Sequence, residues 1–153
     1  MELKVETHNK KETVDLALLL SSFLEVGDVI TLEGDLGAGK TTFVGGTAKG
    51  LGIKEEVISP TFNIMKCYFD GRLPLYHIDA YRLEGQNIEL GLDEAIEGDG
   101  VAFIEWPMFI DPIIPEERLK VEIRNLGGDS RSIAFISTSP RFDNVLTKMK
   151  EQL

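Results

Sequence analysis

The chain has 153 residues, with 16 lysines and arginines against 26 aspartates and glutamates, and its length predicts one domain spanning residues 1–153. The formal net charge of −10 should repel nucleic acid, so any RNA that this protein serves is expected to be held by another protein. A single cysteine, Cys67, excludes an internal disulfide, and no apolar run approaches a membrane span, so we expect a cytoplasmic protein without a membrane segment.

The first predicted elements are a strand over residues 2–7, where polar and apolar residues alternate, and a helix that follows it. Asn9 and Glu12 have the spacing of a capping box at a helix start, with asparagine in place of serine or threonine. The helix is expected to run to about Leu24, because apolar residues recur along one face. Val26-Gly27-Asp28 should end it.

A phosphate-binding loop is predicted next, after a buried strand over residues 28–33. Gly34-Asp35-Leu36-Gly37-Ala38-Gly39-Lys40-Thr41 matches the pattern G-x-x-x-x-G-K-[ST]. Glycine allows the backbone angles that turn successive N–H groups toward phosphate oxygens, and the helix that follows directs its positive end at the same anion. Lys40 could then reach the β- and γ-phosphates, and the Thr41 hydroxyl could bind Mg²⁺.

The remaining elements alternate between strands and helices. Beyond the helix that follows the loop, Ser59-Pro60-Thr61-Phe62 is expected to be extended or turning backbone. The later predictions are strands over 62–69 and 74–80, a weak helical segment over 86–97, strands over 101–105, 119–123 and 132–136, and a final helix opened by Ser139-Pro140 whose apolar face runs from Phe142 to Leu153. This order predicts an α/β protein, a three-layer sandwich of the P-loop NTPase type. Its central sheet should be mainly parallel, with added antiparallel strands and helices on both faces.

Two predicted strands end in carboxylates, at Asp79 and Glu105. A phosphate loop needs a carboxylate at the end of a neighbouring strand, either to hold Mg²⁺ or to orient the attacking water. Ordinary solvated strand ends are the alternative interpretation of each. Thr61 lies where related enzymes place a threonine that senses the γ-phosphate, but from its spacing alone an ST-turn or a strand start is the favoured interpretation.

Two further side chains have open interpretations. His77 should share a strand face with Asp79, and a packed or hydrogen-bonded histidine is the default interpretation. Trp106 could cover the site or a partner, or could simply be half-buried. The guanine-reading sequence [NT]-K-x-D does not occur, which favours ATP, and no cysteine–histidine cluster has zinc spacing.

Five blocks of the sequence, taken together, resemble the TsaE family, formerly the YjeE-type ATPases. They lie in the family's order along nearly the whole chain. The blocks are Gly34 to Phe43, Ser59-Pro60-Thr61-Phe62, His77-Ile78-Asp79-Ala80-Tyr81-Arg82-Leu83, Glu89-Leu90-Gly91 and Glu105-Trp106-Pro107. The resemblance implies an ATP-hydrolysing protein that supports formation of threonylcarbamoyladenosine at position 37 of tRNA, in complex with the TsaB and TsaD proteins.

The resemblance also assigns residues to ATP and Mg²⁺. It places Thr41 and Glu105 on Mg²⁺ and Asp79 and Thr61 by the γ-phosphate, with Lys40, Asp79, Glu105 and Thr61 as the catalytic set. The residues that it implies for ATP binding are Gly37, Ala38, Gly39, Lys40, Thr41, Thr42, Lys10, Thr13 and Arg131, with Lys10 to Thr13 near the adenine.

Two other functions stay open at this stage. The sequence Gly37-Ala38-Gly39-Lys40-Thr41 also occurs in small-metabolite kinases, although those enzymes need an acceptor pocket and a mobile lid. A nucleotide-gated binding module with negligible turnover is the third possibility.

Overall fold

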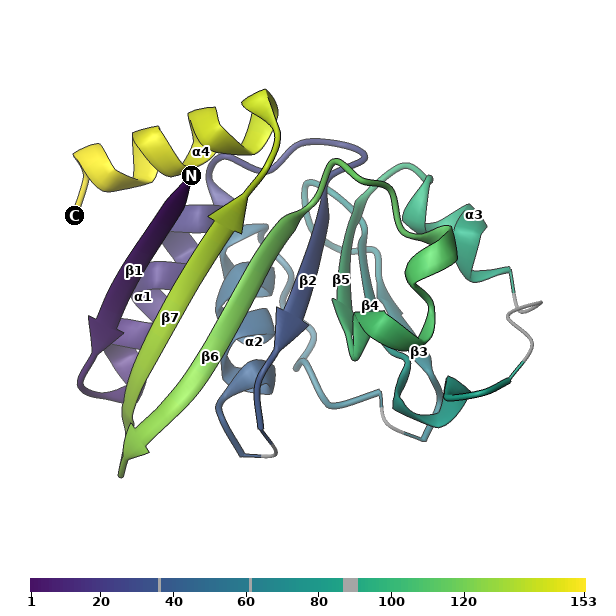
Figure 1. Ribbon diagram of the computed structural model, residues 1–153, viewed down its shortest axis with the longest axis horizontal. Helices are drawn as coiled ribbons and strands as arrows, with labels where there is room; N and C mark the ends of the chain where they lie inside the picture. The colour runs from purple at the N-terminus through teal and green to yellow at the C-terminus, as the bar shows by residue number, and fades with distance from the viewer. Residues whose placement is uncertain (36, 61, 87–90) are drawn as a thin grey trace.

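The computed structural model describes residues 1–35, 37–60, 62–86 and 91–153, and its centre is a seven-stranded mixed sheet (Figure 1). The strands are β1 (Glu2–Thr7), β2 (Val29–Glu33), β3 (Met65–Tyr68), β4 (Leu75–Asp79), β5 (Val101–Glu105), β6 (Leu119–Gly127) and β7 (Ser130–Ser137). The α-helices are α1 (Lys10–Ser21), α2 (Lys40–Gly50), α3 (Leu92–Ile96) and α4 (Pro140–Glu151). Three short 3₁₀ turns cover Tyr81–Leu83, Pro107–Phe109 and Asp111–Ile113.

The strand order β1-β7-β6-β2-β5-β4-β3 puts β2 in the middle of the sheet. The pairs β2–β5, β2–β6 and β4–β5 are parallel, whereas β1, β7 and β3 pair antiparallel at the two sides. The arrowheads of β2, β5 and β6 therefore point to one edge in Figure 1, where the chain turns from β2 into α2. Open α/β sheets bind ligands at this carboxyl edge.

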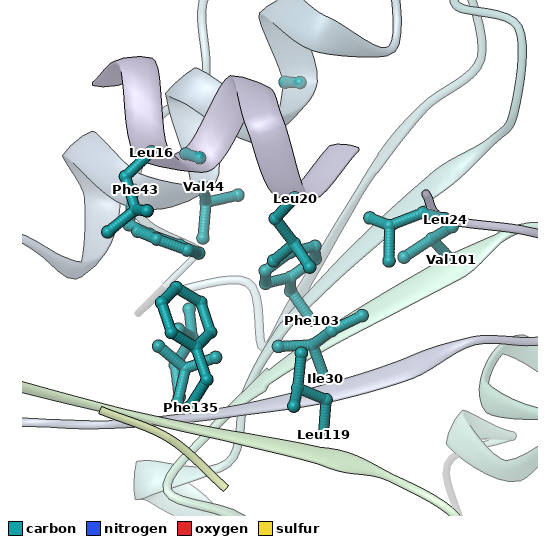
Figure 2. Close-up of a cluster of buried hydrophobic side chains, with 14 of the residues drawn as sticks. Leu16, Leu20, Leu24, Ile30, Phe43, Val44, Val101, Phe103, Leu119 and Phe135 are labelled. Atoms are coloured by element: carbon teal, nitrogen blue, oxygen red, sulfur yellow. The ribbon is translucent and has the colours of Figure 1, made fainter. Parts of the chain in front are cut away.

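Helices α1, α2 and α4 cover one face of the sheet and enclose the larger hydrophobic core (Figure 2). Phe43 of α2 lies between Phe103 of β5 and Phe135 of β7, with ring centroids 6.5 and 6.1 Å away. All three rings are fully buried, and tilted aromatic pairs of this kind add to the stabilisation from burial. This packing holds α2 across the middle of the sheet and so determines where its N-terminus lies.

The opposite face is covered over part of its width. Helix α3 and the 3₁₀ turns pack over β2, β5 and β4, around buried residues such as Ile78 and Ile104. Over β1 and β6 the same face carries charged side chains, among them Lys120, which pairs with Glu33 and Glu122. The predicted α/β sandwich with helices on both faces is confirmed, but its third layer is short.

The predicted helix starts are present in detail. The Asn9 side chain accepts a hydrogen bond from the Glu12 backbone N–H at 2.8 Å, and the Ser139 hydroxyl accepts one from Phe142 at 3.3 Å. Helix α1 ends at Ser21 rather than near Leu24, because the Ser21 and Ser22 hydroxyls donate back to carbonyls of the last turn. No helix in the described ranges is long and apolar enough to cross a bilayer.

Other boundaries differ from the predictions for local reasons. Strand β3 begins at Met65 instead of residue 62, because a turn closed by Asn63 N–H and the Pro60 carbonyl precedes it. Strands β6 and β7 are longer than predicted and are joined by a tight turn at Gly128 and Asp129. Of the helix predicted over 86–97, the structure shows α3, and residues 87–90 lie outside the described ranges. Leu153 follows the end of α4 and is exposed, so it does not extend the apolar face.

One ion pair joins α4 to the start of β2. Arg141 donates to the buried Asp28 carboxylate at 2.6 Å and to the Phe23 carbonyl at 2.7 Å. The hydrogen bond with Asp28 raises the pKa of the Arg141 guanidinium above its ordinary value. Arg141 therefore stabilises the packing of α4 against the connection between α1 and β2.

Arg141→Met should destabilise the protein by roughly 2–4 kcal/mol, because it leaves the Asp28 carboxylate buried without its charged partner. Urea unfolding followed by circular dichroism measures the change. Lys11→Met is the matched control, since Lys11 forms an exposed pair with Asp15 on the surface of α1 and its loss should have no measurable effect. Equal effects of the two substitutions would contradict the proposed anchoring.

Candidate nucleotide-binding site

A cavity of about 770 Å³ opens at the carboxyl edge of the central strands. The loop between β2 and α2 contributes Asp35, Gly37 and Gly39, and the first turn of α2 contributes Lys40, Thr41 and Thr42. The other lining residues come from five separate segments, and they are Lys10, Thr13, Ser59, Asp79, Tyr81, Glu105, Trp106, Asp129 and Arg131. The structure thus gathers residues from positions 10 to 131 of the chain around one cavity.

Glycine is required at both ends of the loop. A Cβ atom at Gly34 would lie 2.6 Å from the Ile123 carbonyl oxygen of neighbouring β6, closer than such atoms approach. Gly39 has φ +101°, a left-handed conformation that side chains disfavour, and it forms the N-cap of α2. Leu36 lies outside the described residues. The loop therefore leaves the free N–H groups of the first turn of α2 at the cavity, as anion binding demands.

Arg131 connects the phosphate loop to the turn between β6 and β7. Its Nε donates to the Ala38 carbonyl at 2.7 Å, and its Nη1 lies 2.8 Å from the carbonyls of Gly128 and Ser130. These contacts span the phosphate loop and the β6–β7 turn. The family resemblance implied only that Arg131 binds the nucleotide. The structure adds that Arg131 holds the phosphate loop through the Ala38 carbonyl.

The two strand-end carboxylates are neighbours. Asp79 of β4 and Glu105 of β5 are paired in the parallel register, and each residue is 5% exposed. An Asp79 carboxylate oxygen accepts a hydrogen bond from the Tyr81 backbone N–H at 3.0 Å. The structure therefore brings both carboxylates to the cavity, and neither is an ordinary solvated strand end.

Lys40 lies between Glu105 and Trp106. Its Nζ is 3.5 Å from Glu105 Oε1 and 5.1 Å from the centre of the Trp106 ring. The Trp106 ring stacks on Phe109 and makes a tilted contact with Tyr81, and its backbone is left-handed, φ +56°. The tryptophan thus lines the cavity and is half-buried, so its role as a cover of the site stays a prediction.

Glu105 also has a hydrogen-bond partner on its core side, His77. The fully buried His77 ring has Nε2 2.6 Å from Glu105 Oε2. Burial alone would raise the pKa of the Glu105 carboxyl, but the hydrogen bond with His77 and the positive charge of Lys40 outweigh it and hold the pKa below its ordinary value. Glu105 is therefore an ionised carboxylate at neutral pH, the form that a cation or a cationic side chain binds.

Residues of α1 and of the β6–β7 region also line the cavity. Lys10 and Thr13 line it together with Asp129 and Arg131. The Thr13 hydroxyl is held by a buried hydrogen bond to the Thr7 hydroxyl at 2.7 Å. The two α1 residues that the resemblance assigned to the adenine thus share one cavity with the phosphate loop.

Some predictions fall differently. Thr61 lies outside the described residues, so its place at the γ-phosphate stays a prediction. Ser59, Tyr81 and Asp129 line the cavity but were not chosen from the sequence. Ser59 and Tyr81 belong to blocks that carry the family resemblance, and that membership is the signal that could have identified them.

The donor set at the loop fits Mg²⁺. Within residues 1–35, 37–60, 62–86 and 91–153, no three His, Cys, Asp or Glu side chains converge as a metal cluster. Mg²⁺ in nucleotide sites is usually held by one or two carboxylates together with substrate phosphates, so it does not need such a cluster. Thr41 and Glu105 line the cavity, and their hydroxyl and carboxylate oxygens are the kind of hard donor that such a site uses.

Comparison with known proteins identifies the family of the chain. A family model described as "Threonylcarbamoyl adenosine biosynthesis protein TsaE" matches residues 7–133, which include every residue named above from Lys10 to Arg131. The chain belongs to the TsaE family. The tRNA threonylcarbamoyladenosine biosynthesis protein TsaE of Bacillus subtilis is 51% identical over 142 residues, 93% of this chain and 90% of that protein.

Other relatives extend the same pattern. The TsaE protein of Treponema pallidum is 38% identical, covering 86% of this chain and 98% of that one. The crystal structure of YdiB from Bacillus subtilis has a TM-score of 0.87 and 45% identity, and the match covers 99% of this chain and 96% of YdiB. The TsaE resemblance inferred from five sequence blocks is thereby confirmed, and so is the P-loop NTPase type of fold.

Arg131→Lys should weaken nucleotide binding about 10-fold, because lysine cannot hold the Ala38 carbonyl and the turn carbonyls at the same time. Calorimetric titration with a non-hydrolysable ATP analogue measures the affinity. Arg124→Lys, the same change at an exposed position of β6, is the control and should leave the affinity unchanged. If the Arg131 variant bound as tightly as the unaltered protein, the tether would have no role in binding.

Proposed function

We propose that this protein is an ATP-hydrolysing subunit that supports formation of N6-threonylcarbamoyladenosine in tRNA, acting together with TsaB and TsaD. The observation that carries the proposal is the meeting of the phosphate loop with Lys40, Asp79 and Glu105 in one cavity of a TsaE-family chain. The curated relatives carry names that refer to the same tRNA modification.

Each residue has a proposed role toward the nucleotide. The backbone of residues 37–42 would bind the phosphates, and Lys40 would leave Glu105 to contact the β- and γ-phosphates. Thr41 and Glu105 would hold Mg²⁺, which supplies positive charge beside the phosphate oxygens when bound. Asp79 would orient the attacking water, because it lies beside Glu105 in the sheet register.

The charges around the cavity support a need for partners. Arg131 is the arginine that lines the cavity in the described part of the chain, and its contacts with Ala38 and the β6–β7 turn commit it to the loop. Arg131 is therefore not expected to act as an arginine finger, and ATP hydrolysis by the isolated protein should be slow. The net charge of −10 agrees with a subunit whose partners hold the tRNA.

The kinase alternative is less well supported by the fold. After α2, the described chain runs through an irregular loop into the β3–β4 hairpin. Metabolite kinases would need an acceptor-binding helical region or lid at this point. We therefore propose ATP hydrolysis in a complex rather than transfer to a small acceptor.

Reconstituted threonylcarbamoylation of tRNA with TsaB, TsaD and a source of carbamoyl-adenylate should require this protein for multiple turnovers. Lys40→Ala should reduce the rate roughly 100-fold or more, because it removes the cation nearest the transferred phosphoryl group. Lys49→Ala, at an exposed position in the last turn of the same helix, is the control and should leave the rate unchanged. Modification that proceeds equally well without this protein would refute the proposed function.

Glu105→Ala separates hydrolysis from gating by the bound nucleotide. We expect the variant to bind TsaB and TsaD, as measured by size-exclusion chromatography, but to stop the modification, because the carboxylate proposed to hold Mg²⁺ is gone. Modification that survives in this variant would show that nucleotide binding alone suffices.

A further inference from the structure

His77 is a buried polar residue that the proposed function does not use. It is 0% exposed and lies in β4 on the sheet face that packs against the larger core, where its neighbour on the same face, Leu75, is apolar. Its polar contact is the 2.6 Å hydrogen bond between Nε2 and Glu105 Oε2. The other ring nitrogen, Nδ1, is buried and has no hydrogen-bond partner in the described structure.

The sheet register explains how this contact arises. Asp79 is paired with Glu105 across β4 and β5, and His77 lies two residues earlier on the same face of β4. His77 is thus the diagonal neighbour of Glu105 on the adjacent strand, farther from the carboxyl edge of the sheet. From this position the ring meets the carboxylate from the core side, and the cavity lies on its other side.

The two oxygens of Glu105 consequently have different partners. Oε2 is held by His77, whereas Oε1 is 3.5 Å from Lys40 Nζ at the cavity. The oxygens of a carboxylate only accept, so the hydrogen in this bond lies on His77 Nε2 whether the ring is neutral or charged. A buried donor of this kind restricts the carboxylate to one orientation.

We propose that His77 is a positioning residue that holds Glu105 so that Oε1 faces the metal and nucleotide. This inference rests on the proposed function, because it assumes that Glu105 binds Mg²⁺ beside a nucleotide. His77 itself does not touch the ligand. Partners that orient a metal-binding side chain typically contribute 10- to 100-fold to metal affinity, and we expect an effect in that range.

The test compares His77→Met with His77→Gln. The two replacements are unbranched and of similar length, but only glutamine carries an N–H donor that can reach Glu105. Folding is checked first by circular dichroism and urea unfolding. Mg²⁺ is then titrated into the complex with a non-hydrolysable ATP analogue, and Trp106, the single tryptophan, which lines the cavity, reports binding by its fluorescence.

His77→Met should weaken Mg²⁺ binding to the nucleotide complex by about 10- to 100-fold, while nucleotide affinity without metal changes little. His77→Gln should recover most of the metal affinity. In a Glu105→Ala background, His77→Met should cause no further loss, because the residue through which it acts is absent.

Three results would overturn the inference. A folded His77→Met variant could keep full Mg²⁺ affinity, both variants could lose it equally, or the loss could persist undiminished in the Glu105→Ala background. If His77→Met does not fold, His77→Asn replaces it, since its shorter amide cannot reach the carboxylate and should lose affinity where glutamine keeps it. Absence of Mg²⁺-dependent nucleotide binding in the unaltered protein would instead reject the proposed function, and the inference with it.

Discussion

The parallel pairing of β2, β5 and β4 is the constraint on which the site depends. Parallel strands end at the same edge, so the chain leaves β2 into the phosphate loop beside the last residues of β5 and β4. Glu105 and Asp79 are those last residues, and their register makes them direct neighbours. A shift of one residue in either strand would turn one carboxylate to the opposite face, away from the loop.

Glu105 has polar partners on two sides. Glu105 accepts from His77 on the core side and faces Lys40 on the cavity side, so a buried carboxylate has a partner in both directions. Lys40 in turn lies over the Trp106 ring. Under the proposed function Lys40 would exchange Glu105 for phosphate, while Glu105 would keep its bond with His77.

Local patterns in the sequence predicted most of the fold, because each depends on neighbouring residues. Asn9 and Ser139 cap their helices as their spacing indicated, and the loop motif lies between a strand and a helix. The hydrogen bond between His77 and Glu105 was not predicted. It depends on which strands pair and in what register, and the sequence patterns do not determine strand order. The Arg131 contact with Ala38 was missed for the same reason, since the two residues are 93 positions apart. The end of α1 depended on the Ser21 and Ser22 hydroxyls, which compete with the helical pattern.

The tether from Arg131 has a consequence for biosynthesis of the chain. A ribosome makes the phosphate loop early, but the arginine that holds its Ala38 carbonyl follows 93 residues later, on a strand that also pairs with β1 at the chain's beginning. Contacts of such long sequence separation form late in folding. The loop therefore acquires its full set of supports only after most of the protein has emerged, and a nascent chain that stops short of β7 lacks them.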